Sequence, residues 1–311
     1  MGGTTQDPPK QVFLVFYQFP EHICFCLFND ELPTKSTEGS FRKINPLSHT
    51  TYKCHVTMTD SSVSRVLQTA LSFLTRGESQ HPQCYSLLLS SDGVLTNQNQ
   101  WEPISKDDSG LVVCNQWVLE TSATVEYESN ISSGYVTLLA VADSAWKAIS
   151  VVSVDSTNRR VCTSNDMHGA IACCWEGYCK ANRACDGKAM SQFFHSECRL
   201  TYSSKEKDGS VTVVSSAEFY DMVANRYSLP IHSPYAKFKD SLEVSARDSL
   251  LGVSLVAPDL AFVRLKVGHP PFLWTDLLVC AKIREESADN GDVGRWWIVA
   301  KSSSSDPFEL P

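Results

Sequence analysis

The chain has 311 residues, of which 42% are hydrophobic and 20% are charged, and it contains 15 glycines and 14 prolines. This composition is typical of a globular protein with room for about two domains, and it excludes collagen, coiled coils and wholesale disorder. The formal net charge of −8 does not favour nucleic acid as a partner, because a nucleic-acid surface needs an excess of basic side chains.

The first part of the chain predicts a hairpin followed by a linker. Residues 12–17 and 23–28 are two apolar runs joined by a short polar segment, which is typical of a β-hairpin. Residues 29–40 are polar and contain one proline and one glycine, as a linker does. We therefore assign residues 1–39 to an N-terminal hairpin and linker.

The same segment bears on the location of the protein. Its apolar runs are among the longest in the sequence, and they are far shorter than the roughly 18 residues that a membrane-spanning helix needs. Residues 1–9 lack the basic region and apolar core of a secretory signal. We expect no membrane span, and we expect the 12 cysteines to be mainly free thiols in a cytoplasmic or nuclear protein.

From residue 41 the pattern predicts a small sheet with one helix. Residues 41–44 and 52–58 predict two strands, and residues 63–74 carry apolar side chains at the three- and four-residue spacing of an amphipathic helix. Residues 85–89 predict a third strand, and residues 111–113 begin another. The order of these elements predicts a ubiquitin-like β-grasp domain over residues 40–120.

A known family shows a similar pattern over residues 40–118. The residues that show this pattern are the predicted strand Ser86–Leu89 that leads to Asp92-Gly93, then Trp101, Ile104, Asp107-Asp108-Ser109 and Leu111–Val113. This stretch resembles the CIDE-N domain, also called the CAD domain, of the apoptotic DNA-fragmentation nuclease, its inhibitor-chaperone and the CIDE proteins. Where the family has a Gly-Gln-x-Trp-like signature, this chain has Cys114-Asn115-Gln116-Trp117.

The resemblance implies a function by contact rather than by catalysis. CIDE-N domains pair head to tail through one basic and one acidic face, and such contacts can propagate. The implied basic face consists of Arg42, Lys43, Lys53, Arg65 and Arg76. The implied acidic face consists of Asp92, Glu102, Asp107 and Asp108. We therefore expect homotypic or heterotypic protein–protein pairing in the regulation of apoptosis or DNA fragmentation.

Residues 121–311 predict a β-rich domain of unknown type. A strand, strand, helix run at 199–227 repeats the order of residues 41–76, but the residues differ, and we do not expect an internal duplication. The helix of this run begins near Ser216. The other expected strands are 125–127, 136–141, 149–154, 242–244, 253–256, 260–267, 277–283 and 296–299.

Six of the 12 cysteines lie in a segment, residues 162–198, that we expect to be a loop. Cys174 and Cys179, together with His195 and Cys198, have spacings that suit two pairs of metal ligands. Four thiolate or imidazole ligands can fold such a segment around structural zinc. Reduced cysteines also pack as small hydrophobic side chains, so buried free thiols are the competing interpretation.

Two alternative functions remain open. The first is a zinc-stabilised adaptor that recruits host proteins, because the segment from Cys173 to Cys179 resembles the Cys-dense part of an adenoviral ubiquitin-ligase adaptor. The second is a nuclease with an unrecognised C-terminal domain, although no catalytic motif of a nuclease, hydrolase or phosphate-binding enzyme is present. On balance the sequence predicts a non-enzymatic α+β protein with no certain cofactor.

Overall fold

The structure, a computed structural model, describes residues 13–19, 22–28, 61–98, 101–104, 110–141, 145–155, 161–203, 211–239, 241–284 and 294–308. The chain divides into two compact units, Met1–Ser61 and Ser62–Pro311. Among the described residues, no helix is both long enough and apolar enough to cross a membrane.

The first unit contains the predicted hairpin. Strands β1 (Phe13–Phe19) and β2 (His22–Phe28) pair antiparallel, with Phe13 opposite Phe28. The hairpin is therefore confirmed. The linker at 29–40 and the predicted strands at 41–44 and 52–58 lie outside the described residues.

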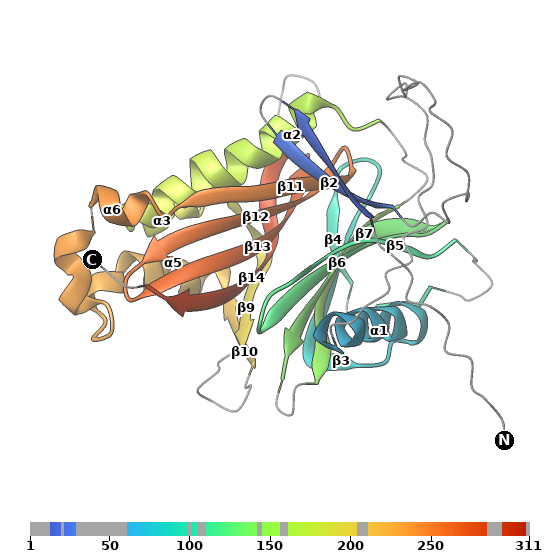
Figure 1. The fold of residues 1–311 in the computed structure, drawn as a ribbon, viewed down its shortest axis with the longest axis horizontal. Helices are drawn as coiled ribbons and strands as arrows, with labels where there is room; N and C mark the ends of the chain where they lie inside the picture. The colour runs from blue at the N-terminus through green and yellow to red at the C-terminus, as the bar shows by residue number, and fades with distance from the viewer. Residues whose placement is uncertain are drawn as a thin grey trace. The chain divides into compact units, whose positions relative to one another are not determined.

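The second unit begins with one helix and a six-stranded sheet, which we call the N-terminal sheet (Figure 1). Its strand order is β4-β3-β8-β7-β6-β5, and only the β3–β8 pair is parallel. The strands are β3 (Gln80–Leu89), β4 (Leu95–Gln98), β5 (Val112–Val118), β6 (Ser122–Glu128), β7 (Ser132–Ala140) and β8 (Trp146–Asp155).

Helix α1 (Ser61–Arg76) covers one face of the N-terminal sheet. The amphipathic pattern seen in the sequence is confirmed, because Val66, Ala70, Phe73 and Leu74 are all buried. These side chains pack against apolar residues of β6 and β7. Burial of one apolar stripe on a sheet is what stabilises such a helix.

The rest of the unit is built on a second six-stranded sheet, which we call the C-terminal sheet. Its order is β10-β9-β14-β13-β12-β11, and only the β9–β14 pair is parallel. The strands are β9 (Phe194–Ser203), β10 (Val211–Ser215), β11 (Ser249–Ala257), β12 (Leu260–His269), β13 (Phe272–Ile283) and β14 (Arg295–Pro307).

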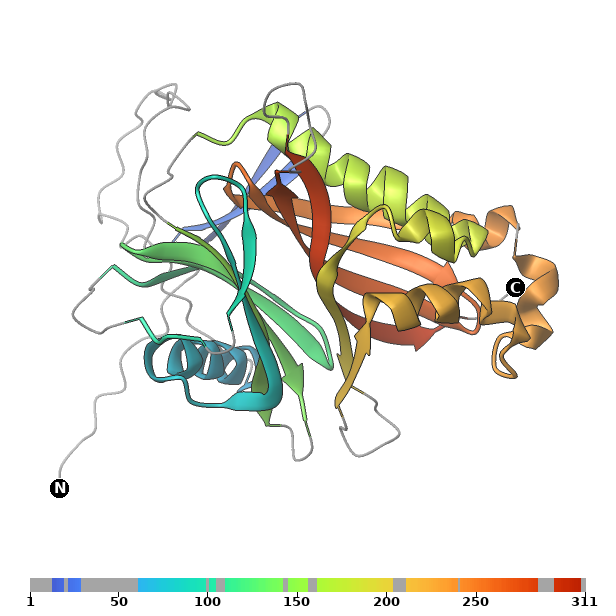
Figure 2. The same cartoon turned by 180° about the vertical axis from the view of Figure 1, so that it is seen from behind.

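Helices cover one face of the C-terminal sheet, as Figure 2 shows from behind. Helix α5 begins with a capping box in which Ser215 and Glu218 satisfy each other's backbone N–H groups. The helical elements are α2 (Ser164–Ile171), the π-helix η3 (Ala172–Cys179), α3 (Lys180–Ala184), α4 (Gly187–Met190), α5 (Ser216–Ala224), the 3₁₀-helices η4 (Arg226–Ser228) and η5 (Ser233–Phe238), and α6 (Leu242–Ser245).

The two sheets have the same topology. In each, a helix precedes the first strand, and the second strand pairs with the first. The last four strands form an antiparallel meander, and its final strand lies parallel to the first strand of the sheet. The two halves differ between their second and third strands, where β10 to β11 includes α5, η4, η5 and α6. The two sheets therefore repeat the same strand topology, although we did not expect an internal duplication from the sequence. The repeated segments are not the two compared there, residues 41–76 and 199–227.

The remaining faces of the two sheets pack against each other. Phe262 of β12 lies with its ring 4.2 Å from that of Trp117 of β5 and 5.7 Å from that of Tyr135 of β7. Tyr135 also donates its hydroxyl hydrogen to the carbonyl oxygen of Ser254, at 3.1 Å. Apolar residues of β3, β7 and β8 join residues of β11 to β14 in one buried cluster. This arrangement leaves the helix-covered face of the C-terminal sheet to form a separate core.

The β-grasp prediction is wrong, although the broader α+β class agrees with the structure. Strands β6, β7 and β8 follow residue 120, where we expected a domain boundary, and yet they belong to the same sheet as β3 to β5. Strand β8 is the parallel neighbour of β3. The error arose because hydrophobic periodicity identifies strands but does not say which distant strand each one pairs with.

The predicted Cys/His-rich loop is also wrong, because most of residues 162–198 is helical. A capping box between Thr163 and Asp166 begins α2. Ala170, Cys174, Tyr178 and Ala181 then recur every three or four residues on the buried side. In the same way residues 242–244, predicted as a strand, belong to helix α6, which begins after the cap residue Ser241.

Candidate ligand-binding cavity

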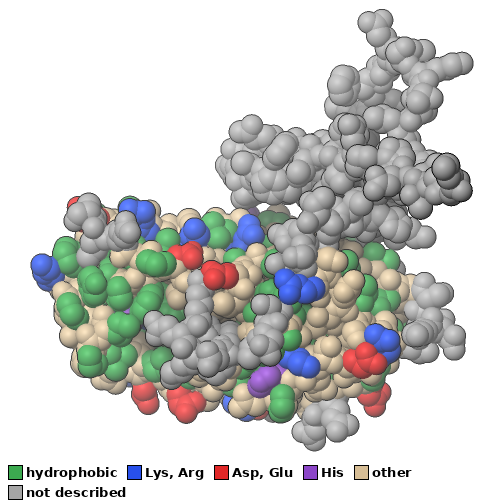
Figure 3. All heavy atoms as spheres, turned by 60° about the horizontal axis from the view of Figure 1, so that its bottom comes forward, with side chains coloured by type: hydrophobic (Ala, Val, Ile, Leu, Met, Phe, Trp, Pro, Cys, Tyr) green, Lys and Arg blue, Asp and Glu red, His purple; other side chains and the backbone are tan. Residues whose placement is uncertain are grey.

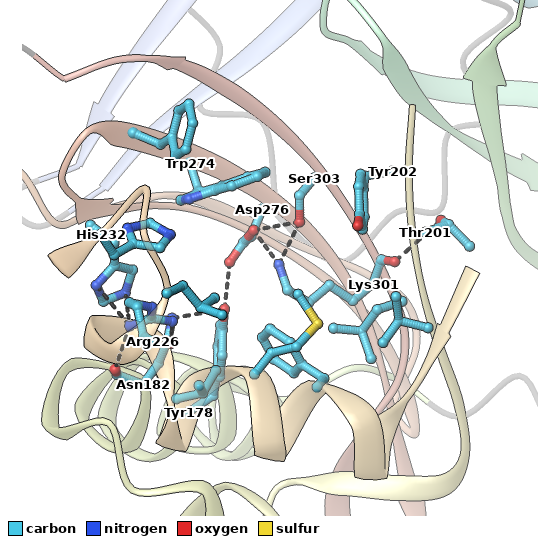
Figure 4. A pocket seen from close by; sticks show the side chains of 18 of the residues that line it. Tyr178, Asn182, Thr201, Tyr202, Arg226, His232, Trp274, Asp276, Lys301 and Ser303 are labelled. Carbon is cyan, nitrogen blue, oxygen red and sulfur yellow. Dashed lines mark hydrogen bonds and ion pairs between the residues drawn. The ribbon is translucent and has the colours of Figure 1, made fainter. Parts of the chain in front are cut away.

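A cavity of about 330 Å³ lies between the helices and the helix-covered face of the C-terminal sheet (Figure 4). Its size is within the range of small-molecule sites. Most of its wall is apolar, including Leu200, Val214, Phe219, Val223, Phe272 and Trp274. Three further lining residues, Met222, Leu229 and Ile231, are large apolar side chains that are exposed to solvent, and we take them to mark the mouth.

One part of the wall is a network centred on the carboxylate of Asp276. Tyr178 donates its hydroxyl hydrogen to Asp276 Oδ2 at 2.7 Å. Ser303 donates to Asp276 Oδ1 at 2.7 Å, and Lys301 Nζ forms an ion pair with the same oxygen. Lys301 also donates to Ser303 Oγ at 2.5 Å. Both members of the ion pair are buried, Asp276 being 1% and Lys301 5% exposed.

The pairing of β13 with β14 places these groups together. Asp276 lies opposite Ser303 in the register, and Lys301 is two residues before Ser303 on the same face of β14. The next residue on β13, Leu277, faces the opposite side of the sheet, where it joins the core between the two sheets. Tyr178 reaches the same carboxylate from the π-helix η3, an irregular helix type that is frequent at functional sites.

A second polar group at the cavity is centred on Arg226, which is 8% exposed. Its Nη2 donates to the side-chain oxygen of Asn182 at 2.5 Å, and its Nη1 donates to the Asn182 backbone oxygen at 3.1 Å. Nη1 also lies 2.9 Å from Nδ1 of His269. The Asn182 amide donates in turn to the hydroxyl of Tyr178 at 3.2 Å, which links Arg226 to the Asp276 network.

Burial sets the protonation of these groups. Burial lowers the pKa of Lys301, whereas its ion pair with Asp276 raises it. Burial and then the charge of Arg226 hold the pKa of His269 well below its usual range, so the imidazole is neutral and accepts a hydrogen bond from Arg226. Burial raises the pKa of Tyr178 well above its usual value, so the phenol remains a donor.

We expect the stability of the protein to fall as the pH drops below 6.5, in part because of His269. The folded chain keeps this side chain neutral at 2% exposure, whereas the unfolded chain protonates it near pH 6.5. Each such histidine lowers the free energy of unfolding by up to about 1.4 kcal/mol per pH unit. Urea unfolding at pH 7, 6 and 5 should show a shallower slope for His269→Gln than for the natural chain.

The matched control is His168→Gln, which alters an exposed histidine on α2. This variant should keep the slope of the natural chain. Equal slopes for His269→Gln and the natural chain would contradict the assignment of a buried neutral imidazole.

The residues predicted to form two charged faces are only partly described. Arg65 and Arg76 lie on α1, where Arg76 forms an exposed ion pair with Glu78 at 3.1 Å. Asp92 lies in the turn between β3 and β4, and Glu102 is exposed. Arg42, Lys43, Lys53, Asp107 and Asp108 lie outside the described residues. On the side shown in Figure 3, acidic and basic side chains are interspersed, and pairing through opposite faces stays a prediction.

The four predicted zinc ligands are not brought together. Cys174 and Cys179 lie on η3, and the Sγ of Cys174 is 3.0 Å from that of Cys280 on β13. His195 and Cys198 lie on β9. In the part of the chain that the structure describes, no group of three or more His, Cys, Asp or Glu side chains is arranged to hold a metal ion. Burial raises the pKa of Cys179 to about 12, as expected of a packed thiol.

The polar residues of the cavity were not predicted from the sequence as a site. One signal was available, namely the ionisable side chain of Asp276 within the mainly apolar strand β13. Ionisable residues in such positions are rarely buried unless they are paired or functional. Arg226 carries no comparable signal, since it follows a short amphipathic helix in a polar stretch.

No protein-family model matches this chain, and no curated protein matches it significantly. Two NTF2-like proteins of unknown function are similar in structure. The one from Shewanella baltica has 17% identity and a TM-score of 0.35, with 48% of this chain and 99% of that chain covered. The one from Silicibacter pomeroyi has 17% identity and a TM-score of 0.33, with 46% and 99% covered.

A ketosteroid isomerase-like protein from Erwinia carotovora atroseptica has 14% identity and a TM-score of 0.29, with 46% of this chain and 98% of that chain covered. At such low identities and TM-scores these similarities support no functional assignment. The comparisons do not test the CIDE-N resemblance, which stays a prediction. The function has to be argued from the cavity itself.

Proposed function

We propose that the C-terminal half of the chain binds a small, mainly apolar organic molecule in the cavity. The observation that carries this proposal is the combination of a cavity of about 330 Å³, a largely apolar wall and a few convergent polar groups. Small-molecule sites have this composition, in which apolar contacts supply affinity and the polar groups fix orientation. The exposed apolar residues at the mouth are consistent with the entry of such a molecule.

The helical segment between β10 and β11 explains why the cavity lies in this half. Residues of α5 and η4 form one side of it, and residues of β9, β13 and β14 form the other. In the N-terminal half, α1 packs directly on its sheet, and Phe73 stacks on Trp101 with ring centres 5.9 Å apart. The extra helical segment therefore supplies the wall that holds a space open.

The Asp276 network is better suited to holding the site than to catalysis. Each oxygen of its carboxylate accepts from protein donors, namely Tyr178 on one oxygen and Lys301 and Ser303 on the other. A carboxylate whose two oxygens already accept from three protein donors holds those side chains in place. We assign binding, and no reaction, to the cavity.

The test is a binding measurement with three acids and their amides. The probes are benzoate, 2-naphthoate and octanoate, and benzamide, 2-naphthamide and octanamide, titrated into the full chain by calorimetry. We expect at least one probe to bind with a Kd below 1 mM. Leu229→Trp, which places a larger side chain at the mouth, should weaken that binding by about tenfold or more, equivalent to about 1.4 kcal/mol, because the indole takes space that the bound molecule would occupy.

Leu242→Trp is the matched control, since Leu242 is 84% exposed and does not line the cavity. This variant should bind the probes as the natural chain does. The proposal fails if no probe binds, or if Leu229→Trp and Leu242→Trp bind equally well.

A further inference from the structure

The charges in and beside the cavity do not balance. Hydrogen bonds link three cations, Arg183, Arg226 and Lys301, through neighbouring groups, and two carboxylates, Asp248 and Asp276, accompany them. Asp248 is committed to Arg183, because it forms an ion pair with that guanidinium and also accepts from the backbone N–H of Gly268 at 2.8 Å. Asp276 is committed to Lys301. One positive charge, that of Arg226, is left over.

Within the described residues, the partners of Arg226 are all neutral. They are the backbone and side-chain oxygens of Asn182, the ring of His269 and, at 3.9 Å, the sulfur of Cys185. Neutral hydrogen bonds only partly offset the cost of removing a cation from water. A carboxylate beside the guanidinium would offset much more of this cost, and the one carboxylate among the described lining residues, Asp276, is paired with Lys301.

Asn182 and His269 hold the guanidinium in place without using all of its donors. Their bonds are made with Nη1 and Nη2, and none of the bonds in the described part of the chain involves Nε. Near the guanidinium, His232 donates from Nδ1 to the carbonyl oxygen of Pro270 at 2.8 Å, so its Nε2 is not used in this bond. Figure 4 shows Arg226, Asn182 and His232 grouped at one end of the cavity.

We infer that the ligand of this cavity is an apolar monocarboxylic acid, bound with its carboxylate against Arg226 and its apolar part along the wall. This inference rests on the proposed function and specifies the ligand class. A single negative charge balances the single excess positive charge, whereas a phosphate dianion would leave an unbalanced charge in an apolar site. A planar carboxylate also matches the planar fork of a guanidinium.

The natural chain alone provides the first test, through the comparison of each acid with its amide. The two forms have almost the same shape, so the cavity wall contacts them equally. We expect benzoate, 2-naphthoate or octanoate to bind about tenfold to a hundredfold more tightly than the matching amide, as a charge-assisted hydrogen bond would give.

Substitution of Arg226 provides the second test. Arg226→Met should remove the preference, so that acid and amide bind within about threefold of each other. Arg226→Lys keeps the charge and is the second variant in case the methionine variant does not fold, and it should retain a reduced preference. The control is Arg76→Met, because Arg76 is an exposed cation at the end of α1. It should leave the preference unchanged.

The outcomes separate this inference from the proposed function. If the amides bind as tightly as the acids to the natural chain, the cavity binds small molecules but the carboxylate inference is overturned. The same conclusion follows if the Arg226 variants keep the full preference for the acid. If neither form binds at all, the proposed function itself fails.

Discussion

Replacement of Asp276 by asparagine should lower the free energy of unfolding by about 3–5 kcal/mol. The substitution keeps the shape of the side chain but removes the charge that compensates Lys301, which is 5% exposed. An ammonium group left in this environment has little access to water, and it must either lose its proton or destabilise the fold. Urea unfolding of the full chain at pH 7, followed by circular dichroism, measures the loss.

The double variant Asp276→Asn/Lys301→Met tests the stated cause. It leaves no uncompensated charge at this point of the network, so it should be more stable than Asp276→Asn alone. Glu102→Gln, at an exposed position of the N-terminal half, should change the stability by less than about 0.5 kcal/mol. A double variant that is no more stable than the single one would show that the ion pair is not the source of the effect.

Replacement of Phe262 by alanine should cost about 3–5 kcal/mol, for a different reason. Phe262 is 1% exposed and lies between the two sheets, with its ring against those of Trp117 and Tyr135. Its removal leaves a cavity that both sheets border, and neither sheet can collapse into it without disturbing the other. The loss should appear as lower stability of the full chain, because Phe262 contacts both sheets.

Urea unfolding of the full chain at pH 7, followed by circular dichroism, also measures the loss for this variant. Leu242→Ala, which shortens a side chain that is 84% exposed, should change the stability by less than about 0.5 kcal/mol. A cost below about 1 kcal/mol for Phe262→Ala would contradict the packing of the two sheets at this point.

The sequence by itself determined most of the local elements. The spacing of Val66, Ala70 and Leu74 predicted helix α1, because a helix turns once every 3.6 residues and its buried side chains must recur at that period. The apolar runs at 12–17 and 23–28, joined by a short polar segment, predicted the hairpin. These features depend on neighbours along the chain, and so they can be read without knowing the fold.

Cysteine shows where a local pattern was misread. Counted as metal ligands, Cys174 and Cys179 suggested a loop. Counted as a small apolar side chain, Cys174 continues the four-residue spacing of Ala170 and Tyr178 in a helix. The choice between these interpretations depends on what the side chains face. Cys174 faces Cys280, more than 100 residues away in the sequence, across a helix–sheet contact.

The tertiary structure alone decided the sheets and the cavity. Strand β8 completes the sheet begun by β3, and β14 completes the one begun by β9, through parallel pairings over long sequence separations that no local pattern encodes. The cavity groups come together in the same way, since Tyr178, Arg226, Asp276 and Lys301 lie on four different elements. Their charges interact strongly only because burial removes water, and burial leaves Arg226 without an opposite charge among the described residues.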